Sequence, residues 1–116
     1  MAVSKIPSSI RYGTVIAGSY YTIEHQTLIK NENIASLSLE IKAVGISGLV
    51  FTNVASLPQG FIPKEATACP CTILDGNASV VYIGHCTISQ EGKISIYTQS
   101  STPANYYFEI NCTFEV

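Results

Sequence analysis

The stretch Ile34–Ala43, "IASLSLEIKA", alternates strictly between apolar and polar residues. Five apolar side chains share one face of this segment, namely Ala35, Leu37, Leu39, Ile41 and Ala43. The other face carries Ser36, Ser38, Glu40 and Lys42. Because successive side chains of a β-strand point to opposite sides, this pattern predicts a strand with one buried face.

The same alternation recurs toward the C-terminus. Residues 105–116, "NYYFEINCTFEV", place an apolar residue at every even position from Tyr106 to Val116. Residues 78–89, "ASVVYIGHCTIS", are apolar on both faces for part of their length, which predicts a strand covered on both sides. The turn "SQEG" leads into "KISIYT" (93–98), and we expect these two segments to form a hairpin. Shorter strands are expected at 12–16, 19–24, 49–55 and 66–74.

Turn-forming residues separate the expected strands, as at Asp75-Gly76-Asn77 and Glu91-Gly92. No long window shows a 3.6-residue apolar stripe with a capped start, so we expect no significant helix. Short strands and turns in a chain of 116 residues predict one all-β domain, an antiparallel β-sandwich or barrel. We place this domain at residues 11–116 and expect residues 1–10 to form an N-terminal arm or docking segment.

The charge of the chain argues against several partners. The net charge is -2, and the six basic residues are scattered, so we expect no nucleic-acid binding. No apolar run approaches about 18 residues, so no membrane insertion is expected. The first residues lack the apolar core of a signal peptide, which predicts synthesis in a cytosol that keeps thiols reduced.

Four cysteines occur at positions 69, 71, 86 and 112. The Cys69-Pro70-Cys71 pair lacks the C-x(2–4)-C spacing of zinc sites, and neither Cys86 nor Cys112 has a partner at such a spacing. No helix follows that would support a C-x-x-C redox motif. We therefore favour buried free thiols over a disulfide or a metal site, and we expect no cofactor. Pro70 cannot donate a ladder hydrogen bond, which predicts an edge or a bulge in strand 66–74.

No catalytic constellation stands out, and we interpret the chain as a non-enzyme. Its two histidines lie outside nucleophile motifs, and its single Asp lies in a turn. The seven tyrosines suggest binding instead, since exposed tyrosines can contact sugars or proteins. The alternative is that these tyrosines cover a neighbouring subunit. Our candidate ligand-binding residues are Tyr97, Asn105, Tyr107, Asp75 and Asn77.

The second half of the chain resembles the C-terminal, receptor-binding domains of bacteriophage tail-fibre, baseplate and head-fibre proteins. The resemblance covers about residues 33–116 and rests on a corner of the type L-P-x-G-[FY]-x-P, here "LPQGFIP" (57–63). The strand–turn–strand region "ACPCTILDGNASVVYIGHCTISQEGKISIY" and the aromatic final strand "NYYFEINCTFEV" follow. Ile62 departs from the pattern, because such corners often carry Arg, and this puts one inter-subunit contact in doubt.

The resemblance implies a small, often jelly-roll-like β-sandwich that assembles as a homotrimer. It implies a virion protein, assembled in the bacterial host cytoplasm, that binds a host cell-surface glycan or protein. The N-terminal arm would then contact other virion proteins. A structural virion protein without receptor binding is the first alternative, as a capsid decoration, head fibre or tail adaptor. A glycan hydrolase and an animal trimeric signalling domain of the tumour-necrosis-factor or complement type are further alternatives.

Overall fold

A computed structural model describes residues 10–116, which form nine β-strands. In chain order the strands are β1 (Ile10–Gly13), β2 (Ile16–Ala17), β3 (Tyr21–Asn31), β4 (Ile34–Ala43), β5 (Gly48–Ser56), β6 (Thr67–Leu74), β7 (Val80–Ile88), β8 (Lys93–Thr102) and β9 (Tyr107–Glu115). Residues 10–116 contain no helix, and therefore no helix that could cross a membrane. Residues 1–9 of the expected arm lie outside the described residues, and Ile10 already belongs to β1.

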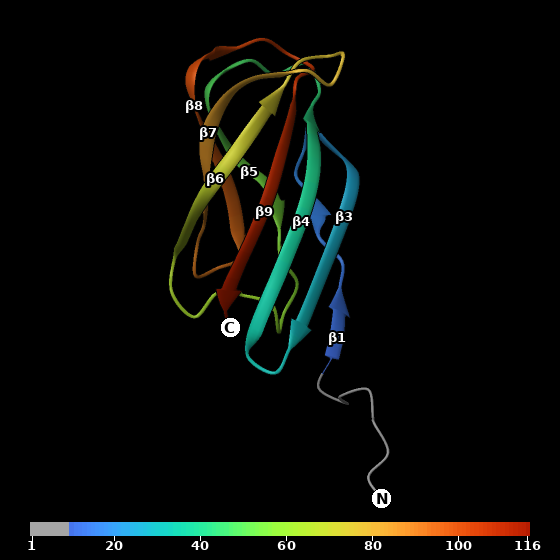
Figure 1. Ribbon diagram of the computed structural model, residues 1–116, viewed down its shortest axis with the longest axis vertical. Helices are drawn as coiled ribbons and strands as arrows, with labels where there is room; N and C mark the ends of the chain where they lie inside the picture. Colours follow the sequence, from blue (N-terminus) through green and yellow to red (C-terminus); the bar gives the residue numbers. More distant parts are fainter. Residues whose placement is uncertain (1–9) are drawn as a thin grey trace, which may run out of the picture.

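All nine strands belong to one antiparallel sheet with the order β1-β3-β4-β9-β6-β7-β8-β5-β2. The sheet curls into a half-barrel around its own apolar face (Figure 1). The expected all-β antiparallel class is confirmed, but the two-sheet sandwich is not the arrangement found. The reason is that β9 pairs with β4 on one side and with β6 on the other, so one ladder connects both halves.

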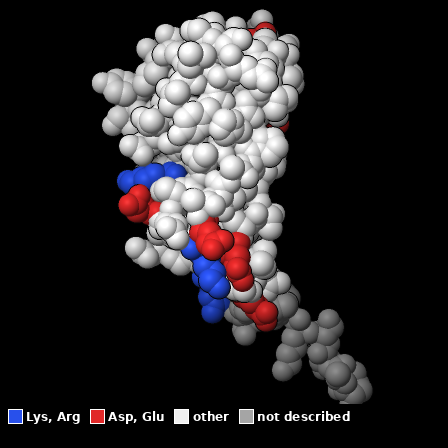
Figure 2. Space-filling view, turned by 90° about the vertical axis from the view of Figure 1, so that its left-hand side faces the viewer, with Lys and Arg blue, Asp and Glu red and all other residues white. Residues whose placement is uncertain are grey.

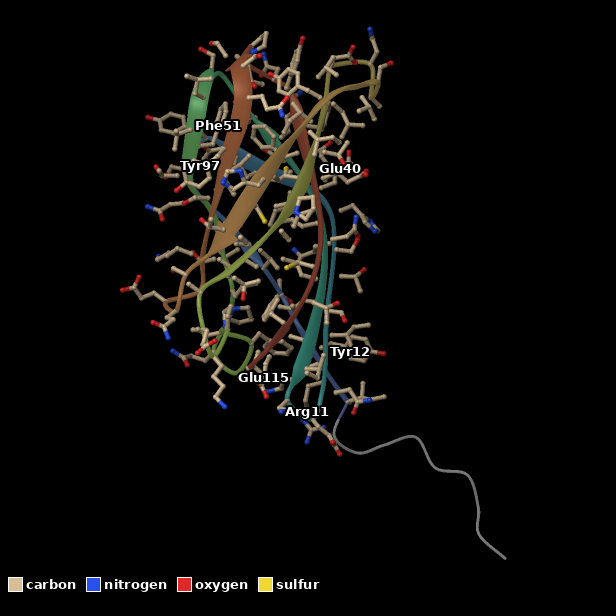
Figure 3. All side chains as sticks on the ribbon, turned by 60° about the vertical axis from the view of Figure 1, so that its left-hand side comes forward. Arg11, Tyr12, Glu40, Phe51, Tyr97 and Glu115 are labelled. Carbon is tan, nitrogen blue, oxygen red and sulfur yellow. The ribbon has the colours of Figure 1, made fainter. Side chains whose placement is uncertain are left out.

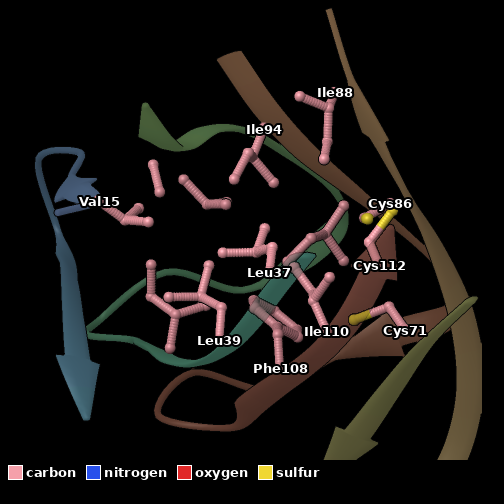
Figure 4. Packing of buried hydrophobic residues seen from close by; sticks show 14 of the residues in the cluster. Val15, Leu37, Leu39, Cys71, Cys86, Ile88, Ile94, Phe108, Ile110 and Cys112 are labelled. Atoms are coloured by element: carbon pink, nitrogen blue, oxygen red, sulfur yellow. The ribbon is translucent and has the colours of Figure 1, made fainter. Parts of the chain in front are cut away.

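The core consists of the inward faces that the alternation predicted. In β4 the five alternating apolar residues from Ala35 to Ala43 are all buried. In β9 the buried positions are Phe108, Ile110, Cys112 and Phe114. These residues pack against Phe51 of β5 and against Ile94 and Ile96 of β8, across the interior shown in Figure 4. The curvature therefore lets a single sheet bury its own apolar side.

The "LPQGFIP" corner closes the lower end of the half-barrel. The N–H of Phe61 donates to the carbonyl of Pro58 at 3.1 Å, and Gly60 has φ +89°, which together define a type II turn. Phe61 is buried, and a Cβ added at Gly13 would lie 2.9 Å from its ring. Lys30 covers the other side of the corner by donating to the carbonyl of Gly60 at 2.6 Å.

Irregular pairing changes several of the expected strands. β3 continues to Asn31 rather than ending at residue 24, and its register against β4 shifts between Ile23 and His25. The expected strand 12–16 is divided between β1 and β2, which pair with opposite ends of the sheet. The pairing of β5 with β8 is also shifted twice. The expectation that Pro70 marks an edge strand is wrong, because β6 lies between β9 and β7, and its register shift falls between Ile73 and Leu74. Pro70 instead lies just outside the β6–β9 pairing, which begins at Cys71.

Candidate functional site

The outer face of β5, β8, β7 and β6 carries a continuous row of uncharged side chains. The pairing register places four residues side by side across these strands, in the order Val50, Tyr97, His85 and Pro70. The rings of Tyr97 and His85 stack with centroids 5.0 Å apart and an interplanar angle of 16°. Together with Val81 and Ile83 of β7, these four residues are called the neutral face below.

Within residues 10–116, no segment covers the neutral face. Val50 is 52% exposed and Ile83 is 50% exposed, although both are large aliphatic residues. The prediction that strand 78–89 is covered on both sides is therefore wrong for the single chain, because only its inward face is buried. Figure 2 shows this side of the molecule, on which the charged side chains gather over the lower part. An uncharged, uncovered apolar patch of this kind is typical of an interaction surface.

A groove of about 320 Å³ opens in the neutral face between β7 and β8. The ladder between these strands ends at His85 and Tyr97, and β8 then bulges away through Thr98 and Gln99. Gly84 allows the two backbones to approach, because a Cβ added there would collide with the carbonyl oxygen of Tyr97. The groove is lined by Ile83, Gly84, His85, Tyr97, Thr98 and Gln99.

Hydrogen bonds hold the bulge that forms one wall of the groove. The hydroxyl of Thr98 donates to the carbonyl of Ser100 at 2.9 Å. Tyr82 crosses beneath, and its hydroxyl bonds the buried hydroxyl of Thr102 and the carbonyl of Ser100. These contacts fix the wall, while the Tyr97, His85 and Gln99 side chains line the opening with polar groups. The groove can therefore bind an uncharged ligand, but it offers no acid–base pair.

Of the candidate residues predicted from sequence, only Tyr97 belongs to this groove. Asp75 instead organises the β6–β7 turn, where its Oδ1 accepts the N–H of Asn77 at 2.8 Å and of Ser79 at 3.0 Å. Asn105 lies in the β8–β9 turn, and its Oδ1 accepts the N–H of Gly45 at 3.3 Å.

Tyr107 begins β9 and lies beneath the ammonium group of Lys42, at 5.6 Å from the ring centroid. Tyr107 pairs with Leu74, the residue before Asp75, so these turn residues gather at one end of the half-barrel (Figure 1). That end is separate from the groove. Sequence reasoning missed His85 and Gly84, because their importance comes from cross-strand neighbours.

The cysteines form a second cluster, on the inward side of the sheet. All four are free thiols; Cys71, Cys86 and Cys112 are buried, and Cys69 is half-buried. This agrees with the expectation of free thiols, but the contact among Cys69, Cys86 and Cys112 was not predicted. A contact with Cys112 lowers the pKa of Cys69, whereas a contact with Cys86 and burial raise it. The net result is a pKa of about 12 for Cys69. The contact with Cys69 and burial also raise the pKa of Cys112.

Residues 10–116 contain no group of three His, Cys, Asp or Glu side chains arranged to hold a metal ion. No protein-family model matches the chain, and no curated protein matches it.

Proposed function

We propose that this chain is a non-catalytic binding module of a bacteriophage fibre or tip that attaches to a host cell surface. The observation that carries the proposal is the neutral face with its groove beside the stacked Tyr97 and His85 rings. Monomeric proteins rarely leave such a patch uncovered without a function for it. The resemblance of residues 33–116 to receptor-binding fibre domains supports the same conclusion.

The chemistry of the groove favours a neutral glycan as its ligand. Sugar hydroxyls both donate and accept hydrogen bonds, which suits the Tyr97 hydroxyl, the His85 ring nitrogens and the Gln99 amide. The apolar C–H side of a sugar ring can pack against Ile83 and the Tyr97 ring. The groove residues carry no Lys, Arg, Asp or Glu, so a charged polysaccharide gains no ion pair there.

The proposed assembly is a homotrimer of these half-barrel subunits, made in the bacterial cytoplasm and incorporated into the virion. One shallow groove of about 320 Å³ would bind a sugar weakly. Three copies held together would convert weak contacts into firm attachment, because the second and third contacts become intramolecular.

A structural virion role is the second candidate, and the aliphatic side chains of the neutral face favour it. Val50, Val81 and Ile83 are each at least 42% exposed, and apolar residues of this kind are suited to packing against another protein subunit. In this case the neutral face would be a contact inside a capsid decoration, head fibre or tail adaptor.

Two measurements on the full chain separate the candidates. The first is binding of the labelled chain to an array of neutral and anionic bacterial surface polysaccharides. The second is the mass in solution by light scattering. The adhesion proposal expects a neutral glycan to be retained by a trimer. Failure to bind any glycan, together with protection of the neutral face from hydrogen exchange in the oligomer, would overturn it in favour of the structural role.

A further inference from the structure

Three cysteines from three neighbouring strands lie at one level of the sheet. Cys69 of β6 pairs directly with Cys86 of β7, and their Sγ atoms are 3.0 Å apart. On the other side of β6, Cys71 pairs with Ile110 of β9. Continuing that register by two residues places Cys69 opposite Cys112, with which it also interacts. Cys69 is therefore the sulfur shared by two potential partners.

The backbone around Cys69 is held on one side only. β6 pairs with β7 from Thr67 onward, but its pairing with β9 begins only at Cys71, immediately after Pro70. Cys69 is half-buried, whereas Cys86 and Cys112 are buried. A small reagent can thus reach the cluster at Cys69, through the break in the ladder.

We propose that Cys69 and Cys86 are a reversible oxidation site, which a hydroperoxide converts into a cross-strand disulfide, with Cys112 as the exchange partner. In the first step the thiolate of Cys69 attacks the terminal peroxide oxygen; because the pKa of Cys69 is about 12, little thiolate is present at neutral pH, so this step is slow there and accelerates as pH rises. The O–O bond breaks, the alcohol or water leaves with a proton, and Cys69 becomes a sulfenic acid. The thiolate of Cys86 then attacks that sulfur and expels hydroxide, which takes up the proton that Cys86 released.

Exchange needs no further oxidant. The thiolate of Cys112 attacks the Cys69 sulfur of the disulfide, and Cys86 leaves as a thiolate and takes up the proton lost by Cys112. The number of disulfides is unchanged by this step. The link moves from the β6–β7 pair to the β6–β9 pair, across the gap in the ladder.

The local geometry can accommodate the bond. Opposed residues of an antiparallel pair have Cβ atoms about 4.5–5.5 Å apart, whereas a disulfide requires about 3.5–4.5 Å. The one-sided pairing of Thr67–Pro70 lets Cys69 make this small approach. Cys71 lacks the same opportunity, because its neighbours across the two ladders are Gly84 and Ile110.

The test is to treat the reduced full chain with hydrogen peroxide, block the remaining thiols with N-ethylmaleimide and digest without reductant. Cleavage at Lys64 and Lys93 and before Asp75, the only Asp, separates the cysteines into peptides 65–74, 75–93 and 94–116. We expect two of the four thiols to be lost and peptides 65–74 and 75–93 to be linked, and a sample treated with dithiothreitol before the N-ethylmaleimide step should regain all four thiols.

Three variants assign the sulfurs. Cys71→Ser should keep the wild-type link, because Cys71 shares its peptide with Cys69 but faces no thiol. Cys86→Ser should link 65–74 to 94–116 instead. Cys69→Ser, or Cys69→Ala if the serine variant does not fold, should form no internal link. The proposal is overturned if all four wild-type thiols remain while added glutathione is fully oxidised, or if 75–93 and 94–116 become linked without Cys69.

Discussion

Gln26 and Val15 exchange two hydrogen bonds through one side chain. The N–H of Val15 donates to Oε1 of Gln26 at 2.6 Å, and Nε2 of Gln26 donates to the carbonyl of Val15 at 3.2 Å. Val15 lies in the two-residue connection between β1 and β2, where the chain leaves the β3 edge for the β5 edge. The amide of Gln26 thus takes the place of a strand partner and helps to hold the two edges of the half-barrel together.

Replacing Gln26 with Leu should therefore destabilise the fold. The substitution keeps an inward side chain of similar size but leaves the N–H and carbonyl of Val15, a residue only 2% exposed, without these partners. An unsatisfied buried polar group costs about 1–3 kcal/mol. Urea unfolding should show a loss of that order, and the amide of Val15 should exchange faster. The neighbouring Thr27→Val change, on an exposed position, is the control; equal effects of both would contradict the role given to Gln26.

The strands that sequence predicted best are those with unbroken alternation. β4 runs over Ile34–Ala43, the bounds that the pattern indicated, and its pairing with β9 has no register shift from Ile34 to Lys42. The prediction ended β3 at residue 24, whereas this strand ends at Asn31. The irregularity between Ile23 and His25 shifts the apolar–polar alternation on which the prediction depended. The two-sheet arrangement was also wrong, since alternation reports which side of a strand is buried and not which strands are paired.

The candidate site was less predictable for a related reason. Tyr97 could be identified as a polar-face aromatic, but its partner His85 is 12 positions away and meets it only through the β7–β8 register. The three-cysteine cluster depends on two registers at once. Conversely, Asp75 and Asn77 looked like binding residues, yet the side-chain oxygen of Asp75 is already used within its own turn.

Gly84 is expected to tolerate no side chain. A Cβ at this position would collide with the carbonyl oxygen of Tyr97 and force β7 and β8 apart. Gly84→Ala should lower the free energy of unfolding by about 1–3 kcal/mol, the usual cost of overpacking. Gly76→Ala is the matched control, because a Cβ there meets nothing within 4 Å, and it should stay within about 0.5 kcal/mol of the wild type. Comparable unfolding midpoints for the two variants would refute the close approach.

Stability should fall at alkaline pH because of the buried thiols. Burial raises the pKa of Cys71 to about 12, and the contact with Cys69 together with burial raises the pKa of Cys112. Each thiol contributes its full stabilisation of the folded state below the unfolded-state pKa, near 8.5. This stabilisation decreases as pH rises toward the folded-state pKa, because only the unfolded chain then releases protons. The loss should be on the order of 1 kcal/mol per pH unit for each thiol above about pH 9.

Urea unfolding of the reduced chain at pH 7, 9 and 10.5 measures this pH dependence of stability. The double variant Cys71→Ala, Cys112→Ala is the reference, because lysines and tyrosines ionise in both proteins. Its unfolding free energy should fall less steeply between pH 9 and 10.5. Parallel pH profiles for the two proteins would contradict the raised thiol pKa values.

Oxidation should stabilise the chain if it forms the Cys69–Cys86 link. The two residues are 17 positions apart, and closing a loop of this size restricts the unfolded chain by about 3 kcal/mol. The peroxide-treated wild type should unfold at higher urea concentration than the reduced form, and dithiothreitol should reverse the shift. Cys69→Ser treated in the same way should show no shift, so a gain in that variant would point to another modification.

Tyr97→Ala should weaken glycan binding without unfolding the chain. Its ring is only half-buried and lies on the outer face, so the core of Figure 4 is left intact. Loss of one stacked ring and one hydroxyl should weaken binding at least tenfold. Tyr12→Ala is the matched control, since Tyr12 is 76% exposed on β1, far from Tyr97 in Figure 3. If Tyr97→Ala binds like the wild type and Tyr12→Ala does not, the groove between β7 and β8 is not the binding site. If both variants bind normally, the ligand contacts neither the groove nor β1, and the turns around Asp75 and Asn105 become the next region to change.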